Sequence, residues 1–198
     1  MPANKPETTI RAILAAAEQL FVQRSYADVT MRDIAEAAQV TTGALYHYFP
    51  GKERLYYEMM TAYLGRVRQA SLEATPGQGR CRDRLYMLTR VFLGMPAEQR
   101  NLMNLVRRDI NAFKGHTREG LVRAYQAAVP DLVEAIVRDG MRGSELKQRD
   151  ARWLAWSYVA IVETTLSDYA QHSLGGLDER LEAALELFFD GAGVVHAD

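Results

Sequence analysis

The chain has little cysteine and no apolar stretch long enough to span a membrane. Cys81 is the only cysteine among 198 residues, so no internal disulfide can form, and a reducing compartment is expected. The first nine residues are polar and lack the apolar centre of a signal peptide. The longest strongly apolar stretch, residues 153–162, ends at Glu163 and falls short of the roughly 20 residues that a membrane helix needs. We therefore expect a soluble, cytoplasmic protein.

The chain also has no large excess of positive or negative charge, few prolines, and no histidines at the spacing of metal ligands. Its formal net charge is −1, so any contact with DNA must come from a local arrangement. Six prolines and the absence of low-complexity tracts argue against extensive disorder. His116, His172 and His196 are scattered along the chain, which predicts no metal site. No cofactor is predicted.

Helical periodicity dominates the sequence, and no segment shows a convincing strand alternation. Pro130 falls inside a long helical segment and predicts a kink there. Residues 75–79, TPGQG, are the clearest linker. The periodicity predicts an all-α fold of about nine helices, over residues 9–24, 30–38, 41–49, 52–73, 82–94, 97–113, 117–139, 149–172 and 178–190.

Two short predicted helices lie close together near the N-terminus. Thr30 is a suitable N-cap with Asp33 three residues later, a variant of the capping box, and Thr41 is a suitable N-cap for the second helix. About three residues separate the helices, which is the spacing of a helix-turn-helix whose second helix enters the major groove. Leu45 is expected to face inward, leaving polar side chains outside. The helix starts at Thr30, Thr41 and Lys52 are expected to attract phosphate.

These helices belong to a dense motif. Residues 30–55 read TMRDIAEAAQVTTGALYHYFPGKERL, and residues 13–21 read ILAAAEQLF. Together they resemble the DNA-binding signature and the first helix of the TetR family of transcriptional regulators. The resemblance implies a helix-turn-helix DNA-binding domain over residues 7–67, with the recognition motif at about 30–49. It also implies a helical ligand-binding and dimerisation domain over residues 68–198.

The resemblance further implies which residues contact DNA. The chain departs from the family at two positions of the helix-turn-helix. The family usually has Gly where Gln39 stands, at the tight turn, and a left-handed Gln costs on the order of 1 kcal/mol. It often has a basic residue where Thr42 stands, so base recognition here is expected to differ or to depend more on thymine methyl groups. The implied DNA contacts are Thr30, Arg32, Thr41, Thr42, Gly43, Tyr46, His47 and Lys52.

Two interpretations stay open for the apolar and basic residues beyond this region. Methionines and aromatic residues at helical spacing are usually core, but they also suit a pocket for an apolar effector. The basic residues between 107 and 123 form either a solvated face or an entrance for an anionic effector such as an acyl-coenzyme A. The candidate ligand contacts are Met87, Val91, Met103, Arg107, Arg108, Phe113, Tyr125, Trp156 and Glu163.

The last two predicted helices are apolar on more than one face, so each needs two surfaces to pack against. A second copy, in a four-helix interface with two-fold symmetry, is the simplest partner, and a buried pair within a monomer is the alternative.

The prediction is a repressor that binds a palindromic operator as a homodimer and is released by a small apolar or acyl-type effector. A ligand-binding protein without DNA binding and a transcriptional activator are the alternatives. An enzyme is disfavoured because no nucleophile, metal or phosphate motif accompanies Glu163, Asp168 and Tyr169.

Overall fold

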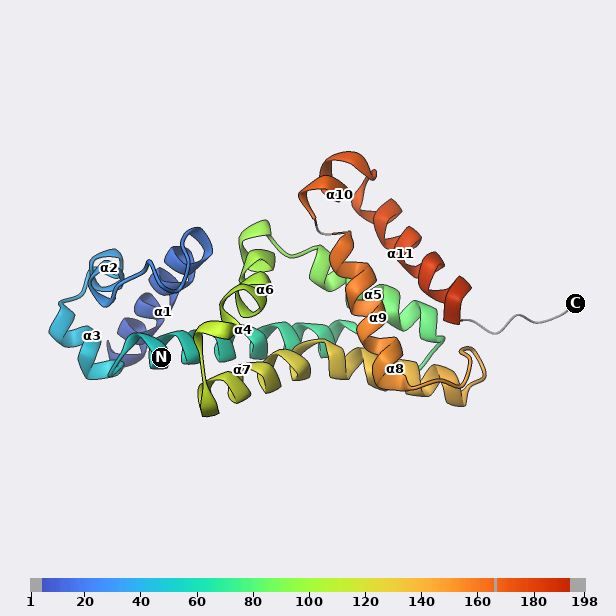
Figure 1. Cartoon of the computed structure of the whole chain (residues 1–198), viewed down its shortest axis with the longest axis horizontal. Helices are drawn as coiled ribbons and strands as arrows, with labels where there is room; N and C mark the ends of the chain where they lie inside the picture. The colour runs from blue at the N-terminus through green and yellow to red at the C-terminus, as the bar shows by residue number, and fades with distance from the viewer. Residues whose placement is uncertain (1–4, 166, 193–198) are drawn as a thin grey trace, which may run out of the picture. The chain divides into compact units, whose positions relative to one another are not determined.

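A computed structural model describes residues 5–165 and 167–192 (Figure 1). The regular elements of this part of the chain are helices, so the predicted all-α fold class is confirmed. In chain order they are α1 (Lys5–Gln23), α2 (Met31–Ala37), α3 (Thr42–Tyr48), α4 (Lys52–Ala74), α5 (Cys81–Leu93), α6 (Ala97–Asp109), the 3-10 helix η1 (Ile110–Ala112), α7 (Gly115–Ala128), α8 (Pro130–Arg142), α9 (Ala151–Thr164), α10 (Asp168–Ser173) and α11 (Leu177–Ala192).

Two of the predicted long helices are each divided, and those predictions were wrong. Pro130 does not kink one helix but begins α8, directly after α7 has ended at Ala128. The first turn of a helix tolerates proline because its missing N–H has no partner there, whereas a helix interior does not.

The predicted helix 149–172 is interrupted between Thr164 and Asp168. The Thr165 hydroxyl donates to the Val162 carbonyl at 2.6 Å, and the Ser167 hydroxyl donates to the Thr164 carbonyl at 2.9 Å. Hydroxyl side chains that bond to nearby backbone in this way compete with helix continuation. Ser167 then caps α10 by accepting from the Ala170 amide at 3.2 Å.

The first of two compact units comprises the described residues up to Gly65 together with Pro96–Ala124. It holds α1 to α3, the first part of α4, α6, η1 and the first part of α7. An aromatic cluster lies in its core. The rings of Phe21 and Tyr56 are 5.0 Å apart, those of Tyr26 and Phe113 are 4.7 Å apart, and those of Tyr56 and Phe113 are 4.9 Å apart. This cluster joins α1 and α4 to the segment that follows α6.

The second unit comprises Arg66–Met95 together with the described residues from Tyr125 onward. Its core is formed by α5, α8, α9 and α11. The buried hydroxyl of Tyr158 donates to the Leu85 carbonyl at 3.3 Å and lies 2.6 Å from the Thr89 hydroxyl, so this polar group is satisfied inside the core. The domain boundary predicted between residues 67 and 68 stays a prediction. The initial stretch of the first unit ends near it, at Gly65, but that unit also includes Pro96–Ala124.

Candidate nucleic-acid interface

The start of each short helix is capped as the sequence predicts. The Thr30 hydroxyl accepts from the Asp33 amide at 3.2 Å, and the Asp33 carboxylate accepts from the Thr30 amide at 2.9 Å, which completes a capping box. These hydrogen bonds lower the pKa of Asp33. The Thr41 hydroxyl accepts from the Ala44 amide at 3.1 Å. Both caps satisfy amides that a helix leaves without a partner, so the two helices begin at defined residues.

The turn between α2 and α3 contains a residue in the left-handed region. Gln39 has a φ of 56°, as expected for the position where the family usually has glycine. Its amide donates to the Glu36 carbonyl at 3.0 Å, and the Val40 amide donates to the Ala35 carbonyl at 3.0 Å. These bonds close the turn despite the unfavourable conformation of a residue with a side chain.

One side of α3 is buried and the other is exposed. Leu45 is fully buried, and Phe49, which follows the helix, is 1% exposed. Tyr46 is 50% exposed, and the ring of His47 packs edge-on against Tyr48 at 5.2 Å. Seven of the eight predicted DNA contacts are exposed residues on α2, on α3 or at their caps: Thr30, Arg32, Thr41, Thr42, Gly43, Tyr46 and His47. Hydroxyl, guanidinium, phenol and imidazole groups are all suited to contacts with phosphate and base edges.

Lys52, the eighth predicted contact, is engaged within the protein. Its ammonium donates to the carbonyls of Tyr26 at 2.7 Å and Val29 at 2.8 Å, with a longer bond of 3.4 Å to Ala27, and it lies 4.4 Å from the centre of the Tyr26 ring. Burial lowers the pKa of Lys52, and the Asp28 carboxylate opposes that shift. Lys52 therefore fastens the start of α4 to the loop between α1 and α2. Its DNA contact stays a prediction.

Arg108, a predicted ligand contact, is engaged in a similar way. Its guanidinium donates to the carbonyls of Phe21 at 2.9 Å and Arg24 at 3.0 Å, and it pairs with Asp109 at 2.8 Å. Asp109 is 6% exposed and accepts from the Tyr56 hydroxyl at 3.2 Å. Burial, with Asp109 nearby, raises the pKa of Tyr56. Arg108 thus connects the end of α6 to the end of α1, a contact for which the sequence contains no signal.

The other predicted ligand contacts are divided between the two units. Met103 and Phe113 are buried in the first unit, and Arg107 is exposed there. In the second unit, Met87 is 37% exposed and Val91 is half-buried.

Three of the predicted ligand contacts are brought together in the second unit. The Tyr125 hydroxyl donates to the Glu163 carboxylate at 3.0 Å, and the rings of Tyr125 and Trp156 are 6.1 Å apart. A phenol, an indole and a carboxylate from α7 and α9 therefore lie side by side. Their binding role stays a prediction.

No metal-binding cluster and no membrane helix occur in residues 5–165 and 167–192. Within that part of the chain, no three His, Cys, Asp or Glu side chains gather closely enough to hold a metal ion. None of its helices is both long and apolar enough to cross a membrane.

Comparison with known proteins identifies a matching family and a curated relative. Residues 13–59 match the family of bacterial regulatory proteins described as the tetR family. The chain is 32% identical over 86 residues to the HTH-type transcriptional repressor NemR of Escherichia coli K12, a stretch that covers 43% of either protein. The match therefore spans less than half the length of this curated relative. The family match at residues 13–59 covers the predicted helix-turn-helix.

Two solved structures have the same fold over nearly the whole chain. AibR in complex with isovaleryl coenzyme A and operator DNA has a TM-score of 0.75 at 19% identity, covering 90% of this chain and 97% of that one. FadR from Bacillus subtilis in complex with stearoyl-CoA has a TM-score of 0.77 at 18% identity, covering 94% and 99%. At these identities the likeness establishes the fold alone.

Proposed function

Because the chain belongs to the TetR family of transcriptional regulators, we propose that it is a repressor that binds operator DNA through the exposed face of α3. The observation that carries this proposal is the division of α3 into a buried side anchored by Leu45 and an exposed side bearing Thr42, Tyr46 and His47. A recognition helix needs both: one side holds it in its domain, and the other enters the groove. The protein acts in the cytoplasm and is not an enzyme.

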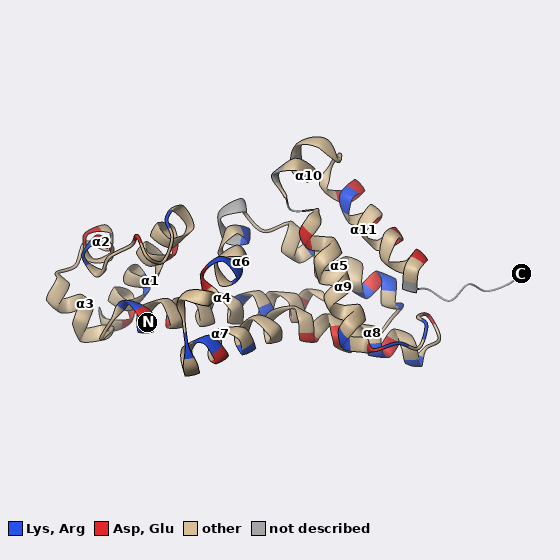
Figure 2. Ribbon diagram, viewed as in Figure 1, with Lys and Arg blue, Asp and Glu red and all other residues tan. Residues whose placement is uncertain are grey.

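The formal charge of the first unit supports DNA binding, whereas the net charge of the whole chain does not. This unit has twelve Lys and Arg against ten Asp and Glu, a formal charge of +2, whereas the second unit has a formal charge of −3. Figure 2 shows basic residues on α6 and at the start of α7. A small positive charge predicts few phosphate contacts per half-site and therefore a shallow dependence of affinity on salt.

The protein acts as a homodimer through its last helices. Trp153 of α9 is 74% exposed and Leu187 of α11 is 65% exposed. Both line a hollow of about 280 Å³ that also includes Leu154 and Ile161. Large exposed apolar side chains around a hollow favour burial against a second copy. Two copies would place two recognition helices in successive major grooves about 34–36 Å apart, so the operator is roughly palindromic.

A small effector of apolar or acyl type releases the repressor. The similarity in fold to AibR and FadR, whose structures hold acyl-coenzyme A ligands, supports this class of effector. Tyr125, Trp156 and Glu163 are the candidate contacts that lie together in the second unit. Effector and DNA oppose each other through one coupling free energy, typically about 1–3 kcal/mol.

DNA binding is tested by footprinting on the region upstream of the gene at low salt, where a protected palindrome is expected. Tyr46→Ala should weaken binding at least about tenfold, since each good base contact contributes about 1–3 kcal/mol. Its circular dichroism should be unchanged because Tyr46 is half exposed. The matched control is Tyr169→Ala, which changes a tyrosine that is 71% exposed in the second unit. Absence of any protected palindrome with wild-type protein would refute the proposal.

The dimer is tested by sedimentation equilibrium of Leu187→Glu. A charge buried at an apolar interface is costly, so this variant should sediment as a monomer. Leu72→Glu is the matched control because Leu72 of α4 is also exposed, at 44%, and it should leave the dimer intact. A dimeric Leu187→Glu variant would show that α11 does not form the interface.

A further inference from the structure

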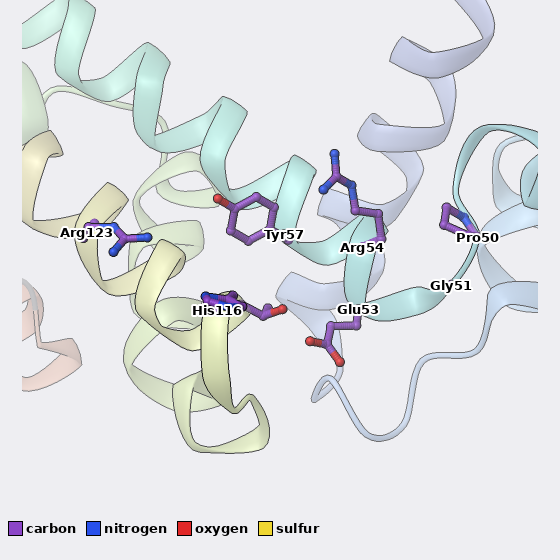
Figure 3. A pocket seen from close by; sticks show the side chains of 8 residues that line it. Pro50, Gly51, Glu53, Arg54, Tyr57, His116 and Arg123 are labelled. Atoms are coloured by element: carbon purple, nitrogen blue, oxygen red, sulfur yellow. The ribbon is translucent and has the colours of Figure 1, made fainter.

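A second hollow lies within the first compact unit, between the start of α4 and the start of α7. It has a volume of about 520 Å³, and we call it the α4–α7 pocket. Figure 3 shows the side chains from both helices that line it. Its lining includes Glu53, Arg54 and Tyr57 from α4 and His116, Thr117 and Arg123 from α7. All of these residues belong to one compact unit, and none is among the effector contacts proposed above.

The Tyr57 ring forms the apolar surface of the α4–α7 pocket. It lies against Gly120 of α7 so closely that a Cβ at position 120 would be 2.6 Å from Cε2 of the ring and 2.8 Å from its hydroxyl oxygen. The Arg54 guanidinium lies over the ring at 5.9 Å from its centre. The glycine thus allows the ring to rest on α7 and leaves the hollow beside it open.

The charges that line the pocket suit a single negative charge. Arg54 is already paired with Glu58 at 2.5 Å, and His116 lies 3.7 Å from Glu119. Arg123 has no hydrogen bond or ion pair with the described residues, and it is an exposed residue. Counting His116 as neutral, the lining has two arginines and one glutamate, a formal charge of +1, and Arg123 is the arginine that is not paired with a carboxylate of the described residues.

We propose that the α4–α7 pocket binds a small organic monoanion with a flat apolar body, of the aromatic carboxylate class. Arg123 pairs with the carboxylate in a two-pronged contact, which a guanidinium is shaped to make. The flat body packs against the Tyr57 ring. Glu53 repels a second negative charge, so phosphates and coenzyme A are poor ligands here. The volume lies within the usual range for small-molecule sites.

The test is calorimetric titration of the full chain with benzoate in the absence of DNA. A ligand of this size should bind saturably with a Kd of about 1 mM. Arg123→Gln should weaken binding at least about tenfold, because a charge-assisted contact is lost. Arg118→Gln is the matched control: this exposed arginine on the same helix does not line the pocket. Benzamide, which has the same shape without the charge, should bind about tenfold more weakly than benzoate.

A second variant tests the apolar surface. Gly120→Ala places a Cβ against the Tyr57 ring and should push it into the pocket, so that benzoate binding is lost while Arg118→Gln retains it. Absence of saturable benzoate binding to the wild-type chain would overturn the proposal, as would equal affinities of Arg123→Gln and Arg118→Gln. Because the assay contains no operator DNA, absence of benzoate binding would not contradict the repressor proposal. In the same way, absence of a protected palindrome in footprinting would not contradict the proposal of this site.

Discussion

Replacing Lys52 with Met separates two roles that a lysine at the start of α4 can have. If the ammonium contacted only DNA, its loss would leave the free energy of unfolding unchanged. In the structure it instead donates short hydrogen bonds to the carbonyls of Tyr26 and Val29 and lies over the Tyr26 ring. The variant keeps most of the aliphatic chain and removes only the charged donor. It therefore tests the polar contacts rather than packing.

The expected cost follows from these contacts. Two hydrogen bonds from a charged donor contribute about 1.5 kcal/mol each at the lower end of their range. The cation–π contact adds about 0.5–1 kcal/mol. Water can reach the half-buried site and satisfy part of the exposed carbonyls, which reduces the total. We expect Lys52→Met to lower the free energy of unfolding by about 2 kcal/mol.

Urea unfolding followed by circular dichroism measures this difference, at one protein concentration for all variants because dimerisation adds to apparent stability. Arg32→Met is the matched control. Arg32 is an exposed predicted DNA contact, and it makes no hydrogen bond or ion pair with residues that the structure describes. It should change stability by less than about 0.5 kcal/mol. If Lys52→Met proved equally harmless, Lys52 would not fasten the loop, and its contacts here would contribute nothing measurable.

Two further outcomes follow from the local structure. Gln39→Gly should stabilise the protein by about 0.5–1 kcal/mol, since relief of a left-handed conformation outweighs the added freedom of the unfolded chain. Ala38→Gly is the control: Ala38 has a φ of −79°, so glycine there should destabilise the protein. Changes of the same sign for both variants in urea unfolding would contradict the argument. Burial raises the pKa of Cys81 to about 12, so its thiol stays protonated below that pH in the folded state and becomes more reactive as pH rises or the chain unfolds. Iodoacetamide at pH 8 should therefore alkylate Cys81 much faster in urea than in buffer, and equal rates measured by mass spectrometry would show that the thiol is accessible.

Local features of the helix-turn-helix were determined by the sequence itself. The caps at Thr30 and Thr41 join atoms only three residues apart, so residue types at a fixed spacing are sufficient to predict them. The left-handed turn at Gln39 is equally local. The period of 3.6 residues also separates Leu45 from Tyr46 and His47, and thereby predicts which side of α3 is exposed.

Two helix boundaries farther along the chain were not predicted by the pattern. Apolar periodicity continues through Pro130 and past Thr164, because it records which side of a helix is buried and not where the hydrogen-bond ladder ends. The endings depend on a missing N–H in the first case and on hydroxyl groups bonded to backbone in the second.

Only the tertiary structure decided what the long cationic side chains do. Lys52 bonds to carbonyls 23 to 26 residues away, and Arg108 bonds to carbonyls 84 and 87 residues away. A flexible side chain at the surface can extend toward a ligand or fold back onto its own backbone, and nothing in the neighbouring sequence distinguishes the two. The contact of Tyr57 with Gly120 is of the same kind, since it exists only where two helices distant in sequence meet.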